Sequence, residues 1–139
     1  MESKKKFINF GILTYVLAFL LFNLWNYINS IIIPQNKDWE IFSYTFFASI
    51  MLYGIALVLF IILSLFIKSK KMNRLLTLIL VYVLIEVVAI LILKESIIIS
   101  IFKTIFLENG GNYVSFLFPI SLIISYFISY KIIKTSGNV

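Results

Sequence analysis

The chain has 139 residues, of which 62% are apolar and only 13% are charged, and its mean hydropathy is +1.07. Soluble domains are about half apolar and about a quarter charged. This composition excludes a soluble enzyme, a soluble nucleic-acid-binding protein and a disordered tail. The chain also has no Cys and no His. Disulfides and thiolate metal sites are therefore excluded, and we predict no metal site and no cofactor.

Four apolar segments are long enough to cross a bilayer as helices, because a spanning helix needs about 20 residues. They lie at about 7–29, 41–67, 75–93 and 113–133. The first follows Lys4, Lys5 and Lys6, but its apolar run is longer than the roughly 7–15 residues of a cleaved signal peptide. The sequence therefore predicts an all-α polytopic membrane protein, a four-helix bundle that forms a single transmembrane domain over 1–139.

The distribution of Lys and Arg predicts the orientation of the four spans. Nine of the 12 basic residues fall at the two chain ends and in the loop between the second and third spans; the other three are Lys37, Lys94 and Lys103. The side richer in Lys and Arg is normally the cytoplasmic one. We therefore expect a protein of the bacterial cytoplasmic membrane with both termini in the cytoplasm. The net charge of +6 would then attract anionic lipid headgroups, and we do not expect it to bind nucleic acid.

A further apolar stretch lies between the third and fourth spans, at 97–107. It is too short to cross the membrane, and its polar residues recur at helical spacing. We predict a short helix over about 96–108, ending at Asn109-Gly110-Gly111-Asn112, where glycine permits a positive φ. This helix would lie flat at the outer face or re-enter the membrane. It would cap the bundle, or serve as a lid or a surface for a partner.

Glu86 is the acidic residue that falls inside a predicted span, eleven residues from the start of the third span at Leu75. A charged carboxylate near the bilayer centre costs about 2.5–3.5 kcal/mol on insertion scales. Because desolvation disfavours the charged form, we expect the carboxyl to be neutral. Three roles remain open: a hydrogen bond between helices, a proton- or cation-linked translocation site, or a pair with a basic residue of a partner.

Small and polar residues indicate how the spans pack. Ser121, Ser125 and Ser129 recur every four residues on the fourth span, a spacing that lets membrane helices approach closely. We expect the third and fourth spans to pack along this serine stripe, with the carboxyl of Glu86 bonded across the contact and Tyr82 one turn below it. Gly54 and Ala56 would give the second span its own close-packing face.

Asn23 falls near the outer end of the first span and could lie inside the hydrocarbon. An amide at that depth needs a hydrogen-bonding partner. We expect it to bond to another helix or to contact a ligand.

The opening stretch KKFINFGILTYVLAFLLFNLW resembles the first helix of the GtrA-like proteins, with Lys6, Phe7, Phe10 and Gly11 at the matching positions. The length and the two-plus-two arrangement of spans are also similar. That family is associated with moving polyprenyl-phosphate-linked sugars across the membrane. Elsewhere the chain departs from the family: Thr14 and Tyr15 stand where the family tends to have Asn, and no family site residue is carried over.

No convergent set of acids, bases or nucleophiles is present in the sequence, so we do not expect an enzyme. We predict a small non-catalytic membrane protein that handles or translocates a lipid-linked or other amphiphilic substrate, with Glu86 near its path. A chain of this size would need a homo-oligomer or a membrane-protein partner to form such a path. The alternatives are an accessory or immunity subunit that binds another membrane protein, and a holin-like pore former.

Overall fold

The structure, a computed structural model, describes residues 4–32, 39–66, 73–94, 96, 98–99 and 113–136. Four long helices make up nearly all of this part: α1 (Lys4–Ile32), α2 (Trp39–Phe66), α3 (Arg74–Leu93) and α5 (Tyr113–Ser136). Each is long and apolar enough to cross a membrane. The prediction of an all-α protein with four membrane-spanning helices is confirmed, and the helices begin or end a few residues from the predicted limits.

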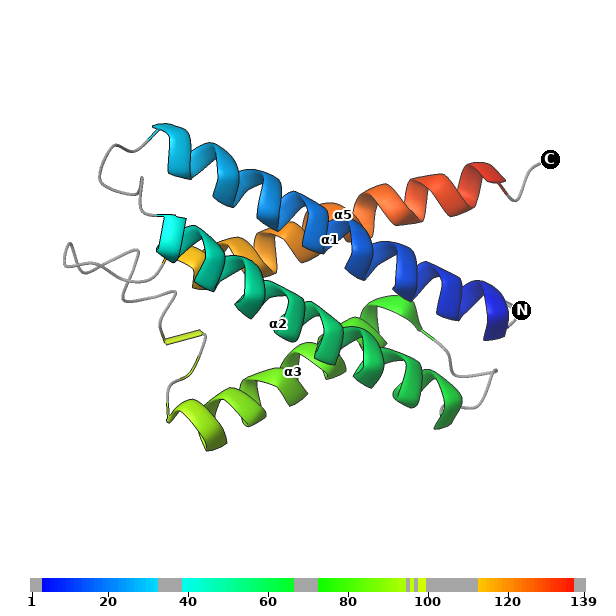
Figure 1. The fold of residues 1–139 in the computed structure, drawn as a ribbon. Coiled ribbons are helices and arrows are strands. Elements are labelled where there is room, and N and C mark those ends of the chain that lie inside the picture. The colour runs from blue at the N-terminus through cyan, green and yellow to red at the C-terminus, as the bar shows by residue number, and fades with distance from the viewer. Residues whose placement is uncertain are drawn as a thin grey trace.

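Successive helices run in opposite directions (Figure 1). The beginning of α1 and the end of α5 therefore lie at the same end of the molecule as the end of α2 and the beginning of α3. We call this end the basic end and the opposite one the outer end. At the basic end, Lys4 Nζ donates a hydrogen bond of 3.0 Å to the carbonyl of Leu65, one of the last residues of α2.

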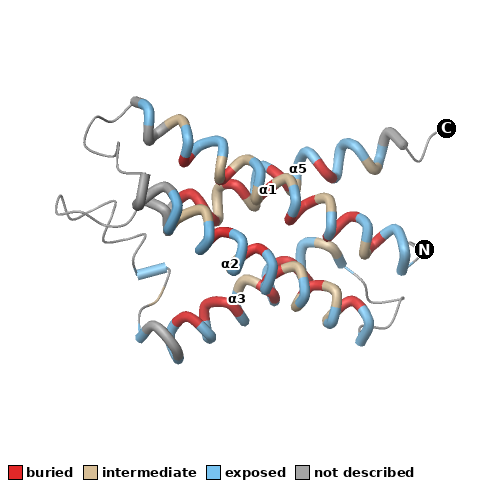
Figure 2. Tube along the Cα trace, viewed as in Figure 1, coloured by how far each residue is buried: buried red, intermediate tan, exposed pale blue. Residues whose placement is uncertain are grey.

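The four helices form an open arc rather than a closed bundle. Helix α1 packs along both α2 and α5, and α3 packs along α2, whereas α3 and α5 make no comparable contact. Buried residues follow the inner faces of the helices (Figure 2). The centre of the core is aromatic and is formed by Phe7, Phe10, Tyr15, Phe22, Tyr53, Phe60 and Phe118.

Local signals explain where α3 begins and ends. The Oδ1 of Asn73 accepts hydrogen bonds from the backbone N–H groups of Leu75 and Leu76, at 3.0 and 3.3 Å, as an N-cap residue does. The helix ends at Lys94, which has a left-handed φ of 55° and so turns the chain away from the helix axis.

The structure gives no support for the short helix predicted over 96–108. Of that segment only Ser96, Ile98 and Ile99 belong to the described residues, and only Ile98 and Ile99 have helical conformation. The Asn109-Gly110-Gly111-Asn112 stop lies outside the described residues.

Candidate functional site

The carboxyl of Glu86 is buried, with 8% of the residue exposed, and it bonds to the segment that follows α3. Its Oε1 accepts hydrogen bonds from the Oγ of Ser96 and from the backbone N–H of Ile98, the latter at 3.1 Å. Its Oε2 has no hydrogen-bond partner among the described residues. Glu86 therefore binds residues that come later in the chain, which fold back towards it.

The predicted bond between Glu86 and the serine stripe is wrong. Ser121 and Ser125 donate to carbonyls of their own helix, to Leu117 O at 2.5 Å and to Ser121 O at 2.6 Å. The stripe is buried, but α5 packs along α1, not along α3. The reason is that a serine hydroxyl in an apolar helix can bond to the carbonyl four residues earlier, so it needs no partner on another helix.

The prediction for the second span is half right. Ala56 is fully buried, whereas Gly54 is exposed and a Cβ built on it would meet no atom within 4 Å. The glycine at which α1 and α2 approach closely is Gly11. A Cβ at Gly11 would lie 2.7 Å from Cζ of Phe60 and closer still to two other atoms of that ring.

Asn23 makes a contact between helices. Its Nδ2 donates hydrogen bonds to the carbonyl of Phe19 at 2.8 Å and to the Oγ of Ser49 on α2 at 3.0 Å. One turn further along, Asn26 Nδ2 donates to the Oγ1 of Thr45 at 2.5 Å. Because both amides bond to α2, this side of the molecule is a polar seam between α1 and α2.

An apolar groove of about 650 Å³ separates α3 from α5. Small-molecule sites typically have volumes of about 300–1,000 Å³. The groove lies on the open side of the arc, where α3 and α5 are not packed along each other. Its walls are apolar apart from two tyrosines, and they consist of Leu75, Leu78, Ile79 and Tyr82 from α3 and Pro119, Leu122, Ile123, Tyr126 and Phe127 from α5.

Aromatic side chains bridge the groove between its two helices. Tyr82 of α3 stacks on Phe118 of α5, with ring centroids 6.0 Å apart and an interplanar angle of 18°. Next to Phe118, Pro119 lacks an N–H group and lies inside α5. Tyr82, predicted as part of the site around Glu86, therefore belongs to the groove wall, one helical turn from Glu86 towards the basic end.

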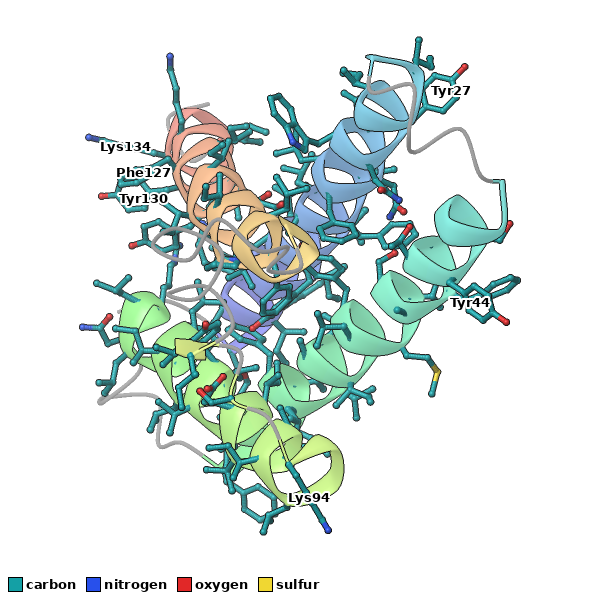
Figure 3. All side chains as sticks on the ribbon, turned by 90° about the vertical axis from the view of Figure 1, so that its left-hand side faces the viewer. Tyr27, Tyr44, Lys94, Phe127, Tyr130 and Lys134 are labelled. Atoms are coloured by element: carbon teal, nitrogen blue, oxygen red, sulfur yellow. The ribbon has the colours of Figure 1, made fainter. Side chains whose placement is uncertain are left out.

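Positive charge collects at the basic end of the groove. The guanidinium of Arg74 lies over the ring of Phe10, 4.5 Å from its centroid, and 5.9 Å from the centroid of Tyr130 on α5. Both distances are within the range of cation–π attraction. Lys131 and Lys134 are exposed on the same part of α5, and Figure 3 shows Lys134 projecting from the side of α5 that carries Tyr130 and Phe127.

The fold and its apolar surface define a small integral membrane protein. Large apolar side chains are exposed on all four helices, as expected of surfaces that face lipid. In comparisons with protein-family models, curated proteins and solved structures, the chain matches none of them.

The groove was not predicted, and neither were the roles of Arg74 and Ser96. Two signals for the groove were present in the sequence. Pro119 interrupts a membrane span, and Tyr126 and Tyr130 lie one turn apart on the same helix face. The sequence does not reveal that this face of α5 is directed at α3 and is separated from it by a groove.

Proposed function

We propose that the protein is a non-catalytic membrane component that binds one amphiphilic molecule of the bilayer, a lipid or a lipid-linked compound, in the groove between α3 and α5. The observation that carries this proposal is the groove itself. It is apolar, large enough for a small-molecule ligand, and placed between two helices whose outer faces meet lipid. A molecule with a long apolar tail reaches such a groove directly from the bilayer.

The charge at one end of the groove supports an anionic headgroup. Arg74 adjoins the groove residue Leu75, and Lys131 and Lys134 lie near the same end of α5. Basic residues at a membrane surface attract anionic lipids by about 1 kcal/mol each. The tail would then lie along Tyr82 and Tyr126, with the headgroup at the basic end.

The orientation follows from the same charges. Both ends of the chain lie on the side of the α2–α3 connection (Figure 1), and this side carries most of the Lys and Arg residues. By the positive-inside rule it is the cytoplasmic side. We propose a bacterial cytoplasmic membrane as the location, with the headgroup taken up on the cytoplasmic side.

The resemblance to GtrA-like proteins suggests which amphiphile to test first. Phe7 and Phe10, two of the matching residues, are fully buried, and Gly11 lies against Phe60. A polyprenyl phosphate is therefore the first lipid-linked ligand to test, next to phosphatidylglycerol, an ordinary anionic lipid. Translocation would further require a second copy of the chain or another membrane protein to complete a path.

The alternative, an accessory subunit, would use the same groove for a helix of another membrane protein. The open contact between α3 and α5 favours this as the second candidate. The two functions differ in what occupies the groove.

A pair of adjacent isoleucines on α5 allows a matched test. Ile123 lines the groove, whereas Ile124 is exposed to a similar extent but does not. We expect Ile123→Trp to fill the groove, and Ile124→Trp to project into lipid without affecting it. Native mass spectrometry of detergent-purified protein would measure the retention of added phosphatidylglycerol or polyprenyl phosphate. Phosphatidylcholine, which is zwitterionic, is the uncharged comparison.

The expected result is one anionic lipid per chain for the wild type and for Ile124→Trp, with retention about tenfold weaker for Ile123→Trp, a loss of about 1.4 kcal/mol. Equal retention by the two variants would overturn lipid binding in the groove. A second polypeptide that copurifies with the wild type and is lost only from Ile123→Trp would favour the accessory subunit instead.

A further inference from the structure

The apolar groove follows only part of α3 and α5. Its residues fall within 75–82 on α3 and within 119–127 on α5, which corresponds to about 10–12 Å along the helix axes. It begins beside Arg74, the first residue of α3, at the basic end (Figure 1). The hydrocarbon core of a bilayer is about 30 Å thick. The groove is therefore long enough for one leaflet, the one on the basic side, and too short to cross the membrane.

The exposure of the groove face of α3 changes at Tyr82. Leu75 and Ile79, before this residue, are 50% exposed. The same helical face continues towards the outer end with Ile85 and Ala89, three and seven residues after Tyr82. These two side chains are only 5% and 7% exposed. Protein therefore covers this face of α3 beyond Tyr82, and the groove does not continue along it.

Two aromatic rings lie across the outer end of the groove. Tyr82 of α3 stacks on Phe118 of α5, with ring centroids 6.0 Å apart, and Phe118 precedes Pro119, the groove residue of α5 nearest to the outer end. Phe118 is itself buried and also contacts Tyr53 of α2, with centroids 5.1 Å apart. The stack is therefore joined to the aromatic core. We call the Tyr82–Phe118 stack the end wall.

We propose that the groove is a site for a lipid of one leaflet, and that the end wall determines how far the tail of this lipid follows the groove. An extended carbon chain advances about 1.3 Å per carbon, because its C–C bonds are about 1.5 Å long and zigzag. The groove therefore accommodates about eight to ten carbons of a tail whose headgroup lies at the basic end. A longer tail leaves through the open side of the groove and enters the bilayer.

Tyr82 is the residue that sets the depth of this site. The end wall limits a tail only if the groove binds a lipid, so its role rests on the proposed function. With the wall intact, one copy of the chain holds a lipid on the basic side and offers it no path along the groove to the outer leaflet. Tyr82→Ala removes the ring that forms the wall, whereas Tyr82→Phe keeps the ring and removes only the hydroxyl.

Photoreactive phosphatidylglycerols measure the depth of the tail directly. One reagent carries a carbene-forming diazirine at about the sixth carbon of a tail, within the groove, and the other at about the twelfth carbon, beyond the end wall. Each is added to the full chain in phosphatidylcholine nanodiscs and irradiated, and the adducts are mapped by peptide mass spectrometry. Adducts that Ile123→Trp reduces and Ile124→Trp does not are counted as lipid bound in the groove.

In the wild type, we expect the sixth-carbon reagent to label Ile79, and the twelfth-carbon reagent to label Ile85 and Ala89 less than about one tenth as often, a ratio that corresponds to about 1.4 kcal/mol. Tyr82→Ala should raise labelling of Ile85 and Ala89 by the twelfth-carbon reagent about tenfold, because a tail that fills the space left by the ring recovers part of the cost of that cavity. Tyr82→Phe should give the wild-type pattern.

The wild-type comparison decides the end wall even if Tyr82→Ala does not fold, which helical circular dichroism would show. Labelling of Ile85 by the twelfth-carbon reagent as frequent as labelling of Ile79 by the sixth-carbon reagent would overturn the wall. A folded Tyr82→Ala protein with the wild-type pattern would also overturn it, while lipid binding in the groove would stand. If no adduct at Ile79 depends on the substitution at position 123, the proposed function is wrong and the role of the wall is wrong with it.

Discussion

A methyl group at Gly11 should destabilise the contact between α1 and α2. The added Cβ would overlap the ring of Phe60, which is fully buried. This ring stacks on Phe7 with centroids 5.4 Å apart and meets Tyr15 edge-on at 5.8 Å. Because neighbours hold the ring on both sides, it cannot move aside without disturbing the aromatic core, and the helices must separate instead.

The size of the effect follows from two opposing contributions. Overpacking of a core typically costs about 1–3 kcal/mol, whereas replacing a helical Gly by Ala stabilises by about 0.5–1 kcal/mol. We therefore expect Gly11→Ala to lower the free energy of unfolding by up to about 2.5 kcal/mol. Gly54→Ala is the matched control. Its Cβ meets open space, so the same substitution should stabilise by about 0.5–1 kcal/mol.

Loss of helical circular dichroism during titration with SDS in mixed micelles measures both variants. Combining Gly11→Ala with Phe60→Leu provides a further check, because the smaller side chain leaves room for the new methyl group. The double variant should lose less stability than the sum of the single changes, since contacting residues are not additive. If Gly11→Ala unfolds at the same SDS fraction as Gly54→Ala, the close approach of α1 and α2 is wrong.

Two polar contacts give further predictions that the same unfolding assay can measure. Removing the amide of Asn23 and the hydroxyl of Ser49, singly and together, should give a coupling free energy of about 0.6 kcal/mol, the average for hydrogen bonds between membrane helices; strictly additive losses would contradict the bond seen between them. Arg74→Leu should cost about 0.5–2 kcal/mol because it removes the cation–π contacts to Phe10 and Tyr130. Arg74→Lys should recover part of that loss, and wild-type stability in Arg74→Leu would refute a role for the contacts.

The spans could be predicted because crossing a bilayer sets a simple length and composition requirement. Which face of each span meets protein and which meets lipid could not be predicted. Helix α2 is apolar on all sides, so its periodicity does not separate the side that meets lipid from the side that meets protein. This is why Ala56 was placed correctly and Gly54 was not: both are small residues in a uniformly apolar helix, two positions apart.

The partner of Glu86 was missed for a different reason. Matching residues by depth in the membrane brought Glu86 level with Ser121 and Ser125 on the fourth span. That comparison considers only straight helices that cross the bilayer. It leaves out a chain that reverses at Lys94 and folds back against the side chain of Glu86. A left-handed Lys has no strong signature in a sequence, so the reversal and the bond to Ser96 become visible only in the structure.

The open groove can persist because α3 packs along α2 and makes few contacts with α5. Lipid tails are as apolar as the groove residues, so pressing α3 against α5 would gain little from burial. At the basic end Arg74 of α3 instead reaches Phe10 on α1 and Tyr130 on α5. Further towards the outer end, the stack of Tyr82 on Phe118 crosses the gap. Changes at Arg74 should therefore alter the stability of the whole arc.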